Sequence, residues 1–246
     1  MPNNSNNPFQ TTYVQAQMVD EGLRRYLLTV YNYMFLGLGV TAITAYLPLR
    51  IPALQSLLFD VSPNGMVHLS GMTWVLFFAQ LGIVFYLAAR VHTMSSQKAQ
   101  GLFWLYAGLM GLSLAPICIL YTGASVFRTF LVTAITFGSM SLYGYTTKRD
   151  LSSLSSFFTM GIIGLILASV VNIFMKSAMI DFIVSAFGVL LFTGLTAYDT
   201  QRIKALYFEG DSHQTRSQKA ILGALALYLD FINLFVYLLR FLGDRR

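Results

Sequence analysis

Charged side chains are scarce in this chain of 246 residues, since Asp, Glu, Lys and Arg together make up only 11% of it. A soluble domain carries about 25% charged residues, and the hydrophobic share here is 56%. Such a composition leaves too little polar surface to coat a globule in water. The scarcity of charge therefore excludes a soluble domain and predicts an integral membrane protein that lies in a lipid bilayer.

Cysteine and histidine are also rare: the chain has Cys118 alone, and His68, His92 and His213. A single cysteine excludes an intramolecular disulfide and any multi-cysteine metal site. The histidines lack the spacing of metal ligands, so we predict no zinc site and no cofactor. The net charge is +6, but no dense basic run with aromatic residues occurs, so a nucleic-acid partner is not expected.

Long apolar runs dominate what remains, and seven of them reach the roughly 20 residues that a helix needs to cross a bilayer. They are too continuously apolar for membrane β-strands, so strands are not expected and the predicted fold is all-α over 27–243. Residues 1–26 read as a polar, mobile tail and lead-in, and 244–246 as a short C-terminal tail. The predicted spans are 27–47, 68–89, 101–121, 125–145, 157–175, 179–198 and 220–242.

The basic residues indicate how the chain lies in the membrane. Of the 16 Lys and Arg residues, ten fall on the N-terminal tail and the even-numbered connections, and six fall on the opposite side. Because cytoplasmic loops carry the excess of basic residues, this distribution favours a cytoplasmic N-terminus and an outside C-terminus.

The last span contains an acid, Asp230, ten residues from Ala220 and therefore about 15 Å along the helix. A charge near mid-membrane costs at least roughly 2.5–3.5 kcal/mol, so this residue should face protein or water and have partners. Steps of three and four residues place small and polar side chains on its face, which we expect to point into the bundle, and apolar ones opposite. The polar face carries Gly223, Ala226, Asn233 and Tyr237, and the apolar flank carries Leu225, Leu229, Phe231, Ile232, Phe235 and Leu239.

A second acid, Asp199, is a candidate partner for Asp230. If the sixth helix stops at Tyr198, Asp199 lies at its edge, whereas a helix that runs on to Leu206 would hold it about 10 Å inside. The loop to the last span would hold about a dozen residues, and consecutive helices joined by such a loop are natural neighbours. Two carboxylates in a dry pocket cannot both ionise cheaply, so they tend to share one proton. Arg90, at the end of the second span, is a candidate counter-charge or else an anchor at the membrane edge.

Three stretches carry a family resemblance: YTGASVFRTFLVTAITFGSMSLYGYTTKRDLS at 121–152, GLTAYDTQRIK at 194–204 and ALALYLDFINLFVYLLRFLG at 224–243. They resemble the Bax inhibitor-1 family, also called the transmembrane Bax inhibitor motif family, and its bacterial inner-membrane branch above all. The resemblance implies a seven-helix fold with the C-terminal helix central and ringed by the other six. It also implies a pH-sensitive calcium leak.

The resemblance assigns roles to individual residues. Asp199 and Asp230 match the two aspartates of a pH sensor by their motifs, while Arg90 matches the arginine that latches them only by span and depth. Carboxylates are suitable ligands for calcium, so the same two acids are possible transient contacts for the transported ion. Asn233 and Tyr237 would support the polar seam around the pair.

Two other functions stay open. A regulatory protein that binds another membrane protein, such as a membrane-bound protease, could use the polar N-terminal tail for docking. An intramembrane aspartyl protease also carries two aspartates on consecutive spans, one of them in a Tyr-Asp pair like Tyr198–Asp199. The LYLD stretch before the second acid lacks the glycine typical of that class. No Walker loop, GxSxG elbow or Cys–His pair is present, so we expect no enzyme.

Overall fold

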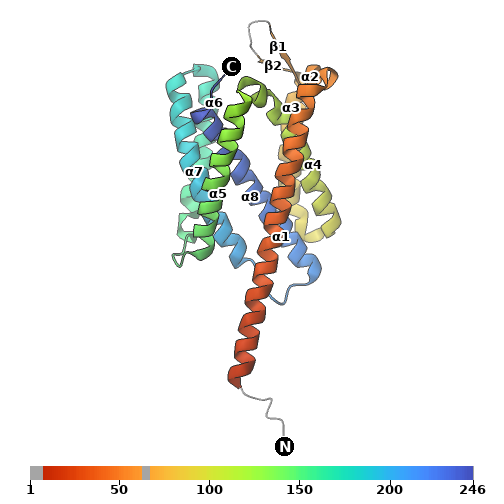
Figure 1. Ribbon diagram of the computed structural model, residues 1–246, viewed down its shortest axis with the longest axis vertical. Coiled ribbons are helices and arrows are strands. Elements are labelled where there is room, and N and C mark those ends of the chain that lie inside the picture. Colours follow the sequence, from red (N-terminus) through yellow and green to blue (C-terminus); the bar gives the residue numbers. More distant parts are fainter. Residues whose placement is uncertain (1–7, 63–66, 246) are drawn as a thin grey trace, which may run out of the picture.

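The computed structural model describes residues 8–62 and 67–245, and the side chains from residue 21 onward (Figure 1). Within these residues, seven helices are long and apolar enough to cross a membrane, which confirms the predicted all-α membrane fold. Short 3-10 turns, η1 (Val91–Thr93) and η2 (Ser152–Leu154), lie between helices. The helices are α1 (Pro8–Arg50), α2 (Pro52–Leu58), α3 (Gly71–Arg90), α4 (Ser96–Leu120), α5 (Gly123–Thr146), α6 (Ser155–Met175), α7 (Ala178–Ala205) and α8 (His213–Leu242).

The first helix is longer than the first apolar run. α1 begins at Pro8, so helix occupies residues 8–26, where we expected a tail and lead-in. Proline suits the first position of a helix because the amide it lacks would have no intrahelical partner there. The part of that expectation that concerns residues 1–7 falls outside the described residues.

The connection between the first two spans contains a small β-hairpin, contrary to our expectation of no strands. β1 (Phe59–Val61) pairs antiparallel with β2 (Val67–Leu69), so Phe59 lies opposite Leu69. The hairpin displaces the start of the second span from the predicted residue 68 to Gly71, because Ser70 accepts a hydrogen bond from the amide of Met72 and caps α3.

Hydroxyl side chains mark where four other spans begin. Ser95, Thr122, Ser177 and Ser212 each accept a hydrogen bond from an amide in the first turn of α4, α5, α7 and α8, respectively. Such a cap stabilises a helix by about 1 kcal/mol, because the first amides of a helix have no partner within it. The short connections between spans are therefore encoded locally.

The last helix is the most buried span. In its most apolar stretch 67% of the residues are buried, compared with 11 to 39% in the other six spans. α8 crosses the bundle obliquely (Figure 1) and packs against α1, α4, α5 and α7. α3 packs mainly on α4, and α6 mainly on α7. The predicted ring of all six other spans around α8 is therefore not confirmed.

Burial on α8 also differs from the predicted division into a polar interior face and an apolar flank. Leu225, Phe231 and Leu239 of the predicted flank are 4%, 2% and 0% exposed. Because helices contact α8 from several sides, its apolar flank packs in protein just as its polar face does. Hydrophobic side chains and Asp230 thus share one interior.

The helix that carries Asp199 approaches its neighbour α5 very closely. A Cβ atom added to Gly144 of α5 would lie 2.2 Å from the carbonyl oxygen of Ala197 in α7. Only glycine permits this backbone contact, which is how small residues let membrane helices pack tightly. The contact fixes α7 two residues before Asp199.

Candidate functional site

The full length of α7 decides where Asp199 lies. The helix continues to Ala205, so the longer of the two predicted versions is correct and Asp199 lies about 9 Å from the helix end. α8 begins at His213, so much of the segment that we expected to be a loop is helical. The connection is short, and α7 and α8 form a tight antiparallel hairpin.

The structure brings the two predicted acids together. The side chains of Asp199 and Asp230 lie within hydrogen-bonding contact of each other. Asp230 is 4% exposed, and the Asp199 side chain is 14% exposed. A carboxylate has no donor, so a hydrogen bond between these two groups requires a proton on one of them.

Asp230 has an unused hydrogen-bonding atom. Its Oδ2 is buried and has no hydrogen-bond partner among the described residues. A buried polar atom without a partner is unfavourable by about 1–3 kcal/mol. A proton, a water molecule or a cation at this oxygen would remove that penalty.

The arginine beside the pair is Arg202. Its Nη1 lies 3.9 Å from Oδ1 of Asp199, one helical turn away, and its side chain is 65% exposed. Arg90 is exposed at the end of α3 and takes part in no ion pair within the described residues. Its role as a latch stays a prediction. The spacing of three residues between Asp199 and Arg202 was a usable signal for the observed contact.

Among the described residues, neither of the two predicted supporting residues forms a hydrogen bond with the acid pair. Asn233 donates a hydrogen bond from Nδ2 to the carbonyl oxygen of Leu229 in its own helix, at 2.8 Å. The ring of Tyr237 stacks on Phe192 with centroids 5.7 Å apart. The amide donor of Asn233 is therefore used within its own helix. Tyr237 packs against α7 at a level about 10 Å along α8 from Asp230.

A group of hydroxyl side chains that sequence reasoning missed lies beside Asp199. The Ser141 hydroxyl of α5 is 3.0 Å from that of Thr200 in α7, and it also contacts the hydroxyl of Tyr31 in α1. Tyr31 and Ser141 line a groove of about 470 Å³ that Phe231 of α8 also borders. A polar connection thus runs from this groove to the residue next to Asp199.

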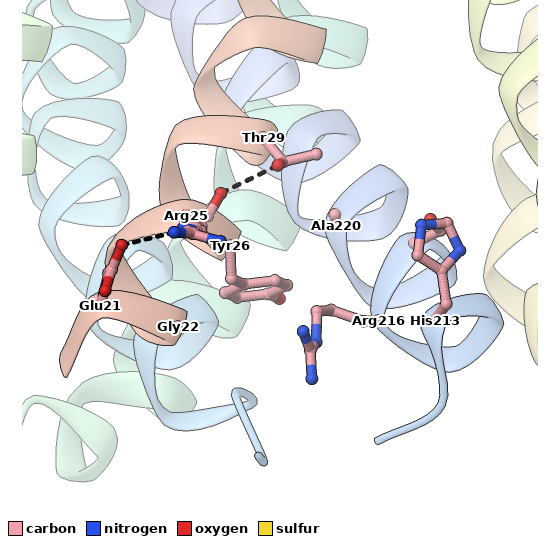
Figure 2. Close-up of a pocket in the computed structure, with 9 residues that line it drawn as sticks. Glu21, Gly22, Arg25, Tyr26, Thr29, His213, Arg216 and Ala220 are labelled. Atoms are coloured by element: carbon pink, nitrogen blue, oxygen red, sulfur yellow. Dashed lines mark hydrogen bonds and ion pairs between the residues drawn. The ribbon is translucent and has the colours of Figure 1, made fainter. Parts of the chain in front are cut away.

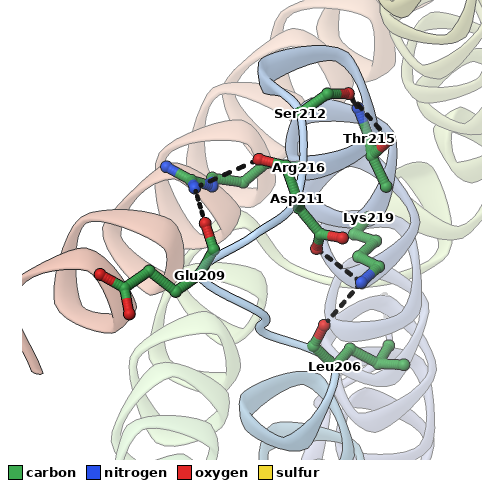
Figure 3. A network of polar contacts seen from close by, with 7 residues as sticks. All are labelled: Leu206, Glu209, Asp211, Ser212, Thr215, Arg216 and Lys219. Atoms are coloured by element: carbon green, nitrogen blue, oxygen red, sulfur yellow. Dashed lines mark hydrogen bonds and ion pairs between the residues drawn. The ribbon is translucent and has the colours of Figure 1, made fainter. Parts of the chain in front are cut away.

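Polar contacts hold the α7–α8 connection in place (Figure 3). Lys219 Nζ lies 2.6 Å from the carboxylate of Asp211 and donates to the carbonyl oxygen of Leu206, at 3.0 Å. Arg216 donates to the carbonyl oxygen of Glu209, at 3.1 Å. These bonds join the end of α7 to the first turns of α8 and so hold the helices that carry both acids.

At the opposite end of the bundle, Asp244 and Arg245 form ion pairs with other helices. Asp244 pairs with Arg128 of α5 at 2.7 Å, and Arg245 pairs with Asp181 of α7 at 3.7 Å. Arg245 also forms a backbone bridge with Tyr121. Two of the three residues predicted to form a short tail are therefore anchored, and Arg246 is outside the described residues.

Seven apolar helices, with two acids in contact between the last two, define a multi-pass α-helical membrane protein with a paired carboxyl site. The chain belongs to the Bax inhibitor family, because the family described as "Inhibitor of apoptosis-promoting Bax1" matches residues 23–246. This finding confirms the resemblance seen in the three sequence stretches.

Several bacterial proteins are similar along nearly their whole length. Inner membrane protein YbhL of Escherichia coli strain K12 is 46% identical over 92% of this chain and 94% of its own. Protein RP147 of Rickettsia prowazekii is 47% identical over 96% of both chains. A protein of Caulobacter vibrioides is 44% identical over 93% of this chain and 92% of its own.

Proposed function

We propose that the protein is a pH-sensitive leak pathway for calcium or another cation, gated by the proton that Asp199 and Asp230 share. The observation that carries the proposal is the contact between the two acids, with Oδ2 of Asp230 buried and unpartnered. Carboxylate oxygens are hard ligands that suit calcium. The Bax inhibitor family assignment is consistent with this function.

The gating step follows from the charge on the pair. With one proton shared, the two side chains hold α7 and α8 together at this level. Once that proton leaves, two negative charges in a medium of low dielectric repel each other strongly. The ionised pair then attracts a free cation or separates, and either event loosens the contact between the helices. If the guanidinium of Arg90 moves onto the ionised pair instead, the arginine keeps the path closed as a latch, and protonation of the acids releases it.

Calcium would be the transported ion and no resident cofactor is proposed. Two carboxylates supply at most four oxygens, whereas calcium takes six to eight. Water molecules would have to supply the rest, so the contact would be transient, as conduction requires. We propose no enzymatic activity for the pair.

The proposed location is the bacterial inner membrane, the membrane named for the E. coli relative. The start of α1 and the end of α8 lie at opposite ends of the bundle (Figure 1), which is compatible with an odd number of spans. The distribution of Lys and Arg supports a cytoplasmic N-terminus and an outside C-terminus.

The test is calcium flux into liposomes that contain the purified protein, measured from about pH 5 to about pH 8, because two buried carboxyl groups in contact tend to share one proton. Asp199→Asn and Asp230→Asn should each flatten the dependence of flux on pH, because an amide cannot exchange that proton. Asp60→Asn is the matched control, since it removes an exposed carboxylate from β1, far from the pair. Flux that responds to pH equally in all four proteins would refute the proposal.

One observation supports a second role, that of a regulatory protein that docks onto another membrane protein. α1 starts at Pro8, whereas the apolar run begins near Leu27, and the extra turns project beyond the rest of the bundle (Figure 1). Deleting residues 8–19 should abolish copurification of a membrane partner while leaving flux intact. A partner that still copurifies with the shortened chain would exclude this segment as the docking element.

A further inference from the structure

A cavity of about 580 Å³ lies between the start of the first span and the first turns of α8 (Figure 2). Arg25 and Tyr26 line it from α1, and His213 and Arg216 line it from α8. Ala220, which also borders it, is about 15 Å along α8 from Asp230. The cavity is therefore separate from the acid pair.

Two hydrogen-bond donors at this cavity lack acceptors. Tyr26 is 2% exposed, and its hydroxyl has no hydrogen-bond partner among the described residues. Nε of Arg216 is likewise buried and unpartnered there. Both groups lie around the ring of Tyr207: the Tyr26 ring centroid is 5.7 Å from it, and the guanidinium carbon of Arg216 is also 5.7 Å from it. Buried donors without acceptors are unfavourable, so an acceptor placed here would be stabilised.

The charges around the cavity leave one cation uncompensated. Arg25 forms an ion pair with Glu21 and is therefore neutralised. The carboxylate of Asp211 is paired with Lys219 at 2.6 Å. Arg216 is bonded only to backbone carbonyl oxygens and to no carboxylate of the described chain. The cavity therefore offers a positive charge and free donors.

We propose that this cavity binds a phosphate group. A guanidinium and a hydroxyl donor match the several acceptor oxygens of phosphate, and arginine is well suited to such contacts because its donors form a planar fork. The start of the first span and the start of α8 lie at the same end of the bundle (Figure 1), and their sequences carry Arg24, Arg25 and Lys219. Basic side chains near the ends of membrane spans commonly meet lipid headgroups. The phosphate comes either from an anionic lipid headgroup or from solution.

The experiment measures binding to the full chain in a non-ionic detergent by titration calorimetry. The probes are dioctanoyl phosphatidic acid, inorganic phosphate and, as a phosphate-free control, dioctanoylglycerol. We expect Tyr26→Phe to weaken phosphate binding about tenfold and Arg216→Gln about 30-fold, because each removes a hydrogen bond to a charged group. Arg149→Gln is the matched control: it removes an exposed arginine on the same side of the bundle and should bind as the wild type does.

The outcomes separate the two sources. Binding of phosphatidic acid alone, weakened by the two substitutions, identifies a lipid headgroup site, and the same losses with inorganic phosphate identify a site that also takes free phosphate. Arg216→Lys keeps the charge if Arg216→Gln fails to fold, and it should still weaken binding through loss of the fork. The proposal is overturned if neither phosphate probe binds, if dioctanoylglycerol binds as tightly, or if Tyr26→Phe binds like the wild type.

Discussion

Two pairs of charged residues, one at the C-terminal end of the bundle and one in its interior, differ in composition and in exposure. At the C-terminal end, Arg128 and Asp244 form an ion pair with side chains 65% and 68% exposed. In the interior, Asp199 and Asp230 bring two acids together, and Asp230 is 4% exposed. Water screens the exposed ion pair, so that pair contributes little to the stability of the fold. The contact between the two buried acids is favourable only while one of them carries a proton. The protein thus contains both an exposed ion pair that ties the C-terminal end to α5 and a buried pair of acids that is the proposed proton site.

Replacing the interior acid should have the largest effect on stability. We expect Asp230→Leu to lower the free energy of unfolding by about 1–3 kcal/mol, because it leaves the largely buried carboxyl of Asp199 without its hydrogen-bond partner. Thermal unfolding in detergent measures this change. Asp244→Leu, at the exposed end, is the control and should change the stability much less. An Asp230→Leu protein as stable as the wild type would mean that the contact between the two acids does not stabilise the fold.

The position of the arginines allows a second test of the interior group. Arg90→Gln should change the free energy of unfolding by no more than about 0.5 kcal/mol, because Arg90 is exposed and forms no ion pair within the described part of the chain. If Arg90 latches the acids in another state, the same substitution should alter calcium flux several-fold. Arg202→Gln, which removes the cation 3.9 Å from Asp199, serves as the comparison. Unchanged flux in Arg90→Gln together with altered flux in Arg202→Gln would reassign the counter-charge to Arg202.

The exposed group should behave as an ordinary surface ion pair. A double-mutant cycle of Arg128→Gln and Asp244→Asn should give a coupling free energy of about 0.2–1 kcal/mol, which falls as salt is raised toward about 1 M. Thermal unfolding of the four proteins at low and high salt provides the values. A coupling free energy of several kcal/mol that does not change with salt concentration would show that the Arg128–Asp244 pair is not screened by water, contrary to its proposed difference from the buried acids.

The smallest effect is expected at an acid that is fully exposed. Hydrogen bonds from Ser152 hold the pKa of Asp150 below its usual range. A lowered pKa in the folded state stabilises the protein above the unfolded value of about 3.9, and this contribution disappears as the pH falls through the folded value. Asp150→Asn should therefore narrow the difference in melting temperature between pH 7 and about pH 3 very slightly. A larger difference in melting temperature in Asp150→Asn than in the wild type would contradict the lowered pKa of Asp150.

The two acids illustrate what could be predicted. Asp230 could be identified from the sequence because a charged carboxylate within a long apolar run is unfavourable in a membrane, whatever the arrangement of the helices. The depth of Asp199 in the membrane depended on where α7 ends. The sequence left open whether this helix stops at Tyr198 or runs on to Leu206, because Arg202 and Lys204 are charged yet continue the helix. Arg202 follows Asp199 by three residues, a helical spacing that predicts contact between the two side chains. The family resemblance nevertheless favoured Arg90 as the counter-charge of the acids.

Other features had no signal in the sequence. Tyr31, Ser141 and Thr200 meet although 110 and 59 residues separate the partners, and each taken alone is an ordinary polar residue in a span. The β-hairpin at 59–69 was missed because its strands are only three residues long. The cavity beside Tyr26 and Arg216 exists only because α1 and α8 lie side by side.

The sequence by itself determined the class of protein, the number of spans and the presence of an acid at mid-membrane depth, because hydropathy and helix rise act locally along the chain. Only the tertiary structure decided which acids touch, which arginine lies beside them and where donors stay unpartnered. Contacts between helices depend on packing that a linear pattern does not contain, such as the approach of Gly144 to Ala197.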